Sequence, residues 1–248
     1  MKNLINNQKT YIKELHTKKG RQEHQAFLIE GEKLVAEAQK SGVAFEYIIA
    51  TNEVKEIAND FGRTSKCEVY FVASSIMESL STFSTPPGII AIAKIPNKHT
   101  HTISPRVLML DGISDPGNLG TLLRSAEWFG FTTVYLSSHC VELYNPKVVA
   151  ATMGSLFRLD IYPNSDLVVT AQELAQQGFA IVATLMNGDH QLPNVKKIAL
   201  VIGSESHGIS VEVLEVTTHS FTIPGGGGAE SLNASVAGSI VMSKVAGI

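Results

Sequence analysis

The sequence has few cysteines, no long apolar run and only a small net charge. Its 248 residues contain two cysteines, Cys67 and Cys140, which are too few for a disulfide framework and lie in no spacing typical of a metal site. No apolar stretch approaches the roughly 20 residues that a membrane-spanning helix needs, and the first residues lack the apolar core of a signal peptide. These absences favour a protein of the reducing cytoplasm with no membrane partner and no bound metal.

The formal net charge of −3 gives no indication of a nucleic-acid partner, but the distribution of charge does. The first 21 residues contain one acidic side chain, Glu14, and a group of basic ones: Lys2, Lys9, Lys13, Lys18, Lys19 and Arg21. Such a cluster is either a solvated helix face or a local patch that attracts phosphates while the whole chain stays mildly acidic.

Short apolar runs rich in β-branched and aromatic residues recur along the chain, with helical patterns between them. This alternation is typical of an α/β fold with mostly parallel sheets. The expected strands cover residues 47–49, 69–72, 89–92, 107–110, 134–136, 180–183 and 199–202. A polar, proline-flanked segment predicts a linker at residues 97–106, which divides the chain into domains of ordinary size, 1–96 and 107–248.

The first of three notable segments, residues 110–131, begins where an apolar strand ends. A turn rich in Asp, Pro and Gly leads to Asn118, which we expect to cap a helix that ends near Gly130. Arg124 interrupts the apolar spacing of this helix close to its core face. A guanidinium there needs a partner, either a structural ion pair or a ligand.

In the second segment, residues 199–210, an apolar strand runs directly into a glycine-flanked turn that carries Glu205. Ligands gather at the carboxyl ends of strands in α/β sheets, and Gly203 and Gly208 would allow a ligand to approach the backbone closely. An ordinary turn with an exposed glutamate is the alternative. The serine and histidine that follow suit a hydrolase poorly, because they are chain neighbours and no G-x-S-x-G motif occurs there.

The third segment, residues 221–241, contains a short strand ending at Ile223-Pro224, a glycine loop at 225–228 and Ser231, an expected helix cap. The glycine loop is not a Walker phosphate loop, because no Gly-Lys-Ser/Thr follows, and no dinucleotide fingerprint is present. The final helix is rich in small residues, which suit a tightly packed or intertwined helix. A simply well-buried C-terminal helix is the alternative.

Together these segments resemble the three signature motifs of the SpoU/TrmH family of RNA 2′-O-ribose methyltransferases. The matching residues are Asn118, Gly120, Arg124, Gly203, Glu205, Gly208, Ile223, Pro224, Ser231, Leu232, Asn233 and Ser235. Each motif alone is weak, but all three in this order form a specific pattern across residues 107–248. Residues 13–42 resemble, less sharply, the substrate-binding domain that precedes many such methyltransferase domains. The glycine-rich loop with Glu230 departs from the family pattern.

The resemblance implies a small N-terminal α/β RNA-binding domain and a C-terminal parallel-sheet methyltransferase domain with a deep trefoil knot. It implies a homodimer with the active site at the subunit interface, and S-adenosyl-L-methionine as cofactor. The expected substrate is a ribose 2′-hydroxyl in RNA. Ribosomal RNA is preferred over transfer RNA, because the additional N-terminal domain resembles those of rRNA enzymes.

The resemblance also assigns roles to individual residues. The catalytic set is Arg124, Asn118, Glu205, Ser231 and Asn233. Arg124 would act either as a base aided by the RNA phosphate or as a clamp that holds the phosphate and polarises the hydroxyl. The cofactor would lie against Thr184, Leu185, Gly203, Ile223 and Leu232, mainly through backbone atoms. The basic residues Lys18, Lys19 and Arg21 would contact RNA.

Other function classes remain open at this point. A non-catalytic RNA-binding or ribosome-assembly factor could share the fold, but it would be expected to lose Arg124, Asn118, Glu205 or Asn233, and all four are present. A small-molecule α/β enzyme such as a hydrolase lacks its required motifs. A base-methylating relative with the same knot is closer, but the Asn-Arg, Glu and Ser-Leu-Asn set is typical of the ribose-modifying branch.

Overall fold

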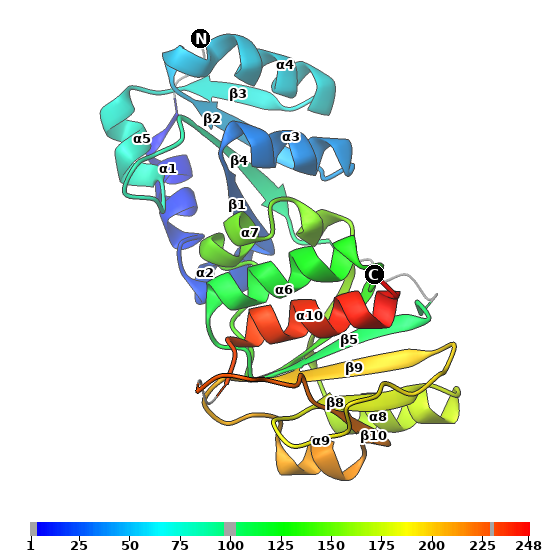
Figure 1. The fold of residues 1–248 in the computed structure, drawn as a ribbon. Coiled ribbons are helices and arrows are strands. Elements are labelled where there is room, and N and C mark those ends of the chain that lie inside the picture. Colours follow the sequence, from blue (N-terminus) through cyan, green and yellow to red (C-terminus); the bar gives the residue numbers. More distant parts are fainter. Residues whose placement is uncertain (1–3, 97–102, 229–230) are drawn as a thin grey trace. The chain divides into compact units, whose positions relative to one another are not determined.

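The computed structural model describes residues 4–96, 103–228 and 231–248, which form two compact units (Figure 1). The first unit contains the described residues before residue 97 together with Glu142–Phe157. The second contains residues 103–141 and Arg158–Ile248. Most of the predicted linker at 97–106, and Glu230 of the glycine loop, lie outside the described residues. One segment from the middle of the chain therefore belongs to the same unit as the N-terminal part.

The first unit is built on a four-stranded mixed sheet in the order β1-β4-β2-β3. Its strands are β1 (Ala26–Glu30), β2 (Phe45–Ala50), β3 (Glu68–Phe71) and β4 (Ile89–Lys94). The helices are α1 (Asn6–Glu14), α2 (Lys18–His24), α3 (Glu32–Lys40), α4 (Lys55–Ser65), α5 (Ser74–Leu80) and α7 (Pro146–Ala151), with 3-10 turns at Asn52–Val54 and Ser155–Phe157. Only β2 and β3 pair in parallel, so the expectation of mostly parallel sheets is wrong for this unit.

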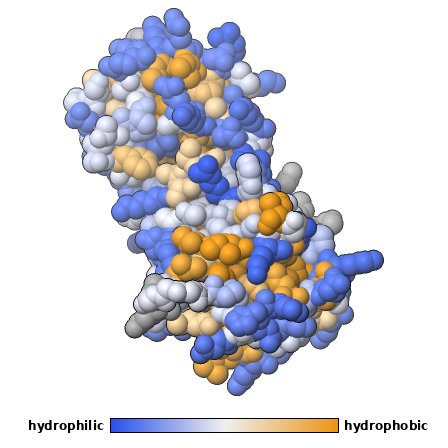
Figure 2. Space-filling view, viewed as in Figure 1, coloured by the Kyte–Doolittle hydropathy of each residue, from blue (hydrophilic) through white to orange (hydrophobic). Residues whose placement is uncertain are grey.

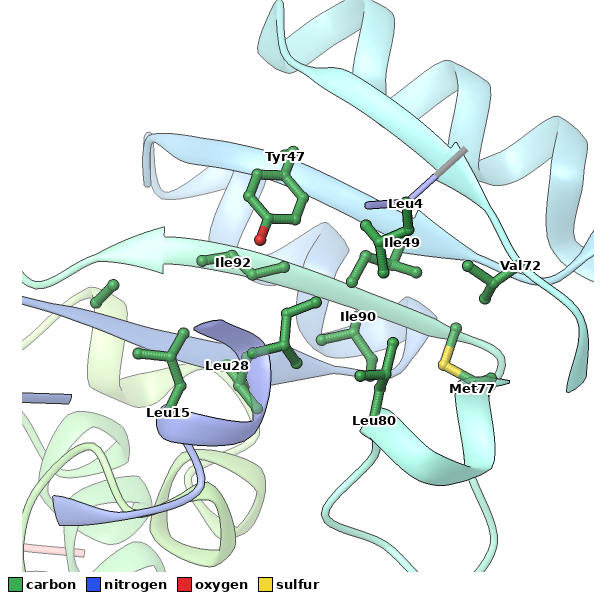
Figure 3. Packing of buried hydrophobic residues seen from close by; sticks show 12 residues of the cluster. Leu4, Leu15, Leu28, Tyr47, Ile49, Val72, Met77, Leu80, Ile90 and Ile92 are labelled. Carbon is green, nitrogen blue, oxygen red and sulfur yellow. The ribbon is translucent and has the colours of Figure 1, made fainter. Parts of the chain in front are cut away.

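The core of the first unit lies between this sheet and its helices (Figure 3). Leu28 of β1, Ile49 of β2 and Ile90 of β4 pack with Met77 and Leu80 of α5. All five side chains of β1 are buried, which shows that both faces of this strand are covered.

The second unit contains a fully parallel six-stranded sheet in the order β10-β8-β9-β5-β6-β7. Its strands are β5 (Arg106–Asp111), β6 (Thr133–Ser137), β7 (Asp160–Ser165), β8 (Ala180–Thr184), β9 (Ile198–Gly203) and β10 (His219–Phe221). Its helices are α6 (Pro116–Trp128), α8 (Leu167–Gln176), α9 (Val211–Glu215) and α10 (Ala234–Ala246). The α/β fold with a parallel C-terminal sheet is confirmed.

Helices α6 and α10 lie side by side on one face of this sheet (Figure 1). Val201 of β9 packs with α8 and α9, whereas the next side chain, Ile202, approaches α10, because successive side chains of a strand point to opposite faces. A Cβ atom added to Gly238 of α10 would lie 2.5 Å from Cδ2 of Leu122 and 2.6 Å from Cδ1 of Ile202. The small residues of the last helix therefore serve close packing, as the sequence indicated.

The two helices nearest the site begin at other residues than the sequence pattern suggested. Helix α6 is capped by Asp115, whose carboxylate accepts a hydrogen bond from the backbone N–H of Asn118 at 2.8 Å. The helix begins at Pro116, because proline is suited to the first helical position. Helix α10 is capped by Asn233, whose side-chain oxygen accepts the Ser235 N–H at 2.9 Å. The predictions of Asn118 and Ser231 as caps are wrong, and the Asn118 side chain is therefore available for other contacts.

Candidate active site

The predicted site residues follow strands whose carboxyl ends share one edge of the parallel sheet, where ligands of α/β proteins bind. Glu205 lies two residues beyond β9, and Asn118 lies in the first turn of α6, which follows β5. Asn233 stands directly before α10. Each of the three comes from a different sequence motif, and the fold brings them together.

Asn118, Glu205 and Asn233 form one hydrogen-bonded cluster, which we call the amide–carboxylate cluster. Oε1 of Glu205 accepts a hydrogen bond from Nδ2 of Asn118 and another, of 3.1 Å, from Nδ2 of Asn233. Nδ2 of Asn233 also reaches Oδ1 of Asn118 at 3.0 Å. The backbone N–H of Ala234 donates to the same Glu205 oxygen at 3.3 Å, so the carboxylate faces the N-terminus of α10. The negative charge is favourable there because of the helix dipole.

The turn that carries Glu205 depends on its two glycines. Ser204 and Gly208 exchange backbone hydrogen bonds of 3.1 and 2.9 Å, which folds the turn back against the end of β9. A Cβ atom on Gly203 would lie 2.2 Å from the carbonyl carbon of Gly208, so no other residue fits there without moving the backbone. Gly208 itself has a positive φ of 69°, which glycine adopts without strain.

A second contact at this edge was missed by the sequence reasoning. Oδ2 of the buried Asp111, the last residue of β5, accepts the backbone N–H and the hydroxyl of Ser210 at 2.8 and 2.7 Å. This pair ties the end of β5 to the residue that precedes α9 and so fixes the far end of the Glu205 turn. The available sequence indication was an acidic residue at the end of an otherwise apolar strand.

Arg124 lies in the middle of α6 and is exposed, not close to the core face. Among the residues that the structure describes, it makes no hydrogen bond and no ion pair. A structural ion pair was the alternative to a ligand-binding role, and the described part of the chain does not support it. Arg124 and Asn118 are six residues apart, about 9 Å along the helix axis, and Arg124 does not join the amide–carboxylate cluster.

The five positions predicted to hold a cofactor also gather at this edge. Thr184 ends β8, Gly203 ends β9, and Leu185 donates its backbone N–H to the carbonyl of Phe221 in β10 at 2.9 Å. Ile223 and Leu232 follow β10 and precede α10, and Leu232 is exposed. The hydroxyl oxygen of Thr184 is buried and has no hydrogen-bond partner within the described residues. Ser231 is exposed and takes no part in the cluster.

The predicted RNA-binding residues behave differently from one another. Lys18 and Lys19 of α2 are exposed, and Lys19 makes an exposed ion pair of 3.7 Å with Glu23. Arg21 is 2% exposed, and its guanidinium donates to Glu142 at 2.6 and 2.9 Å and to the Leu15 carbonyl at 2.8 Å. Because Arg21 is buried and fully engaged, the structure does not support its predicted contact with RNA.

No group of three or more metal-ligating side chains is found among the described residues. In the same part of the chain, no helix is both long enough and apolar enough to cross a membrane. The edge of the parallel sheet thus offers amides, the Glu205 carboxylate, apolar side chains and an arginine that has no partner among the described residues. Such a set is suited to orienting a polar substrate beside a partly apolar cofactor.

The sequence profile of the SpoU rRNA methylase family matches residues 105–243, more than half of the chain and all three motif segments. The chain belongs to this family. A second profile, that of an MRM3-like substrate-binding domain, matches residues 6–91. The N-terminal part of this SpoU protein is therefore a substrate-binding domain.

Relatives of similar length extend the comparison over nearly the whole chain. The 23S rRNA (guanosine(2553)-2′-O)-methyltransferase RlmP of Bacillus subtilis is 33% identical over 95% of this chain and 94% of its own. A protein from Porphyromonas gingivalis assigned to the TrmH family of RNA methyltransferases has 33% identity, covers 98% of both chains and superposes with a TM-score of 0.88. An AdoMet-bound rRNA methyltransferase from Sinorhizobium meliloti is 27% identical, with a TM-score of 0.85 over 98% of this chain and 95% of its own.

Proposed function

We propose that this SpoU protein transfers a methyl group from S-adenosyl-L-methionine to a ribose 2′-hydroxyl of ribosomal RNA. The observation that carries the proposal is the amide–carboxylate cluster, which joins Asn118, Glu205 and Asn233 from three separate motifs at the carboxyl edge of the sheet. Ribosomal RNA is favoured over transfer RNA because two relatives that are similar over nearly the whole chain, the N-terminal domain included, are named as rRNA methyltransferases: RlmP of Bacillus subtilis and the Sinorhizobium meliloti enzyme.

The residues at the sheet edge fit the proposed cofactor. The buried Thr184 hydroxyl lacks a partner among the described residues, and Leu232 offers an exposed apolar surface to a flat adenine ring. When bound there, S-adenosylmethionine supplies a methyl group on a sulfonium, which is already activated and requires no metal. The chain must then position the ribose hydroxyl and assist the loss of its proton.

Arg124 has the chemistry for that role, because it carries an exposed guanidinium without a partner among the described residues. A planar guanidinium binds a phosphate through two hydrogen bonds and at the same time polarises a neighbouring hydroxyl. Asn118 and Glu205, fixed by the amide–carboxylate cluster, orient the ribose. We assign Ser231 to the same pocket, because it is exposed two residues before Asn233.

Cofactor binding is the first test of this function. Calorimetric titration of the purified protein with S-adenosylhomocysteine is expected to show saturable binding without added metal, because the described residues contain no group of three or more metal-ligating side chains. Absence of binding, both with and without RNA, would remove the basis of the proposal.

We further propose that the protein is cytoplasmic and that its second unit contains the trefoil knot of the family. We also propose that it forms a homodimer through α6 and α10. Figure 2 shows apolar side chains gathered over these two helices. Val236 and Ile240 lie one turn apart on α10 and are exposed, and Trp128 of α6 is 81% exposed. Exposed apolar clusters of this kind mark interaction sites. Arg124 precedes Trp128 by one turn, so a dimer that covers Trp128 brings Arg124 to the subunit interface.

Charge on this apolar face is expected to dissociate the dimer. The double variant Val236→Asp/Ile240→Asp should behave as a monomer by light scattering at micromolar concentration, whereas the wild-type protein should have twice the mass of one chain. Val169→Asp on α8 is the matched control, because Val169 and Val236 are both 47% exposed. A monomeric wild-type protein, or a double variant that stays dimeric, would refute this interface.

The exposed lysines Lys18 and Lys19 are the part of the N-terminal domain that we propose for RNA phosphates. Both extend from α2 into solvent, and exposed cations of this kind supply the salt-dependent part of RNA affinity. Arg21 is left out of this surface because its charge is neutralised by Glu142.

A further inference from the structure

The first unit contains a cavity that the proposed methyl-transfer site does not use. Its volume is about 320 Å³, which lies in the range of small-ligand sites. It is formed by the turn that follows β2, by α5, and by the loop that precedes β4. These three segments all follow or precede strands of the mixed sheet, within the domain that matches a substrate-binding family.

The lining of the cavity combines apolar walls with two carboxylates. Val54, Met77 and Pro87 supply apolar surface, and Glu53 and Glu78 supply acceptors. No lining residue is basic. Two carboxylates repel a phosphate, whereas a flat ring with N–H donors gains apolar contact on its faces and hydrogen bonds on its edge. The cavity therefore suits a nucleobase rather than the RNA backbone.

The walls of the cavity are held by hydrogen bonds. The carbonyl of Gly88 accepts the backbone N–H of Thr51 at 2.9 Å, and Gly88 has a positive φ of 78°. The buried carboxylate of Glu30 accepts the Thr82 N–H at 3.0 Å and the hydroxyls of Ser81 and Thr82. The loop before β4 is thus fixed at both of its ends, which lowers the entropy cost of binding a ligand there.

Glu53 is the carboxylate of the cavity whose ionised form is stabilised by neighbouring donors. Hydrogen bonds from neighbouring donors hold the pKa of the Glu53 carboxyl below its ordinary value. The largest contribution comes from the Thr51 hydroxyl, and smaller ones come from the Glu53 backbone N–H and the Ser74 hydroxyl. The group is exposed and ionised at neutral pH, so it can only accept hydrogen bonds.

We propose that this cavity binds one unstacked guanine base of the RNA substrate, with its N1–H and N2–H groups donating to the Glu53 carboxylate. The inference rests on the proposed function, because it assigns RNA as the ligand of this domain. Guanine is the RNA base whose Watson–Crick edge presents two adjacent N–H donors to a single carboxylate. Uracil presents one such donor between two carbonyl groups, and the two would repel the carboxylate.

The test compares short labelled RNA strands on the full-length protein at fixed ionic strength. The probes are UUGUU, the same strand with inosine in place of guanosine, and UUUUU. Fluorescence anisotropy is expected to rank guanosine first, because inosine lacks the N2 amino group. Glu53→Gln should weaken binding of UUGUU about tenfold, within the range of one bidentate base contact, and should not weaken binding of UUUUU.

Glu56→Gln is the matched control, because it removes the same charge from an exposed residue of α4 that does not line the cavity. If Glu53→Gln raises the affinity for all strands alike, the carboxylate only repels phosphate and the inference is wrong. Equal affinities of wild type and Glu53→Gln for UUGUU would also overturn it. Binding of S-adenosylhomocysteine, measured on the same preparations, reports separately on the methyltransferase function and should not change.

Discussion

Replacement of Arg124 by alanine is expected to reduce methyl transfer roughly 10²–10⁴-fold, the range for loss of proton-transfer assistance, while the fold and the cofactor affinity stay intact. The physical reason is that Arg124 is exposed and has no partner among the described residues, so its removal breaks no structural contact that the structure shows. Single-turnover rates on RNA, with melting temperatures measured in parallel, separate catalysis from stability.

Two further variants sharpen this experiment. Arg124→Lys keeps the charge but loses the planar fork that holds a phosphate and a hydroxyl together, so we expect it to restore little activity. Arg63→Ala on α4 removes another exposed arginine and should leave the transfer rate unchanged. Near-normal turnover of Arg124→Ala would be fatal to the proposed mechanism, and a large drop in its melting temperature would indicate a structural role instead.

Loss of the Glu205 carboxylate is expected to have the second largest effect. In Glu205→Ala the amides of Asn118 and Asn233 lose their common acceptor, and the ribose-orienting groups become mobile. Small misplacements in an active site reduce rates by about 10²-fold, and we expect a loss of that order in single-turnover methyl transfer. The melting temperature should change little, because Glu205 is exposed and water replaces it as the partner of both amides.

Glu205→Gln keeps an oxygen acceptor for the two amides and should recover part of the rate, whereas Glu215→Ala on α9 removes an exposed glutamate elsewhere and should have no effect. If Glu205→Ala turns over like the wild-type protein, the amide–carboxylate cluster has no catalytic role. If Glu205→Gln is no better than Glu205→Ala, the charge beside α10 matters more than the hydrogen bonds.

Much of the second unit could be predicted because its central strands are buried on both faces. The sequences of such strands are continuous apolar runs, which are easily recognised. The predicted strands at residues 107–110 and 199–202 lie within β5 and β9. Strand β7 was missed, because its outer part is polar and partly exposed. The mixed pairing of the first sheet could not be predicted either, since strand direction depends on contacts far apart in the sequence.

The site was only partly readable from sequence. The motifs named Asn118, Glu205 and Asn233, but their convergence on one Glu205 oxygen depends on where β5, β9 and α10 meet in space. The basic cluster in the first 21 residues suggested that Arg21 contacts RNA, as Lys18 and Lys19 would. Charge alone does not distinguish these exposed lysines from Arg21, which is paired with Glu142 far along the chain.

The position of the transferred methyl group tests the central claim most directly. Unmodified ribosomal RNA would be incubated with the full-length protein and isotopically labelled S-adenosylmethionine, digested to nucleosides and analysed by mass spectrometry. We expect the label on the ribose of one nucleoside, as a 2′-O-methyl group, and its rate of appearance should fall roughly 10²–10⁴-fold with Arg124→Ala. A label on a base, or no label in any ribosomal RNA fraction, would contradict the account.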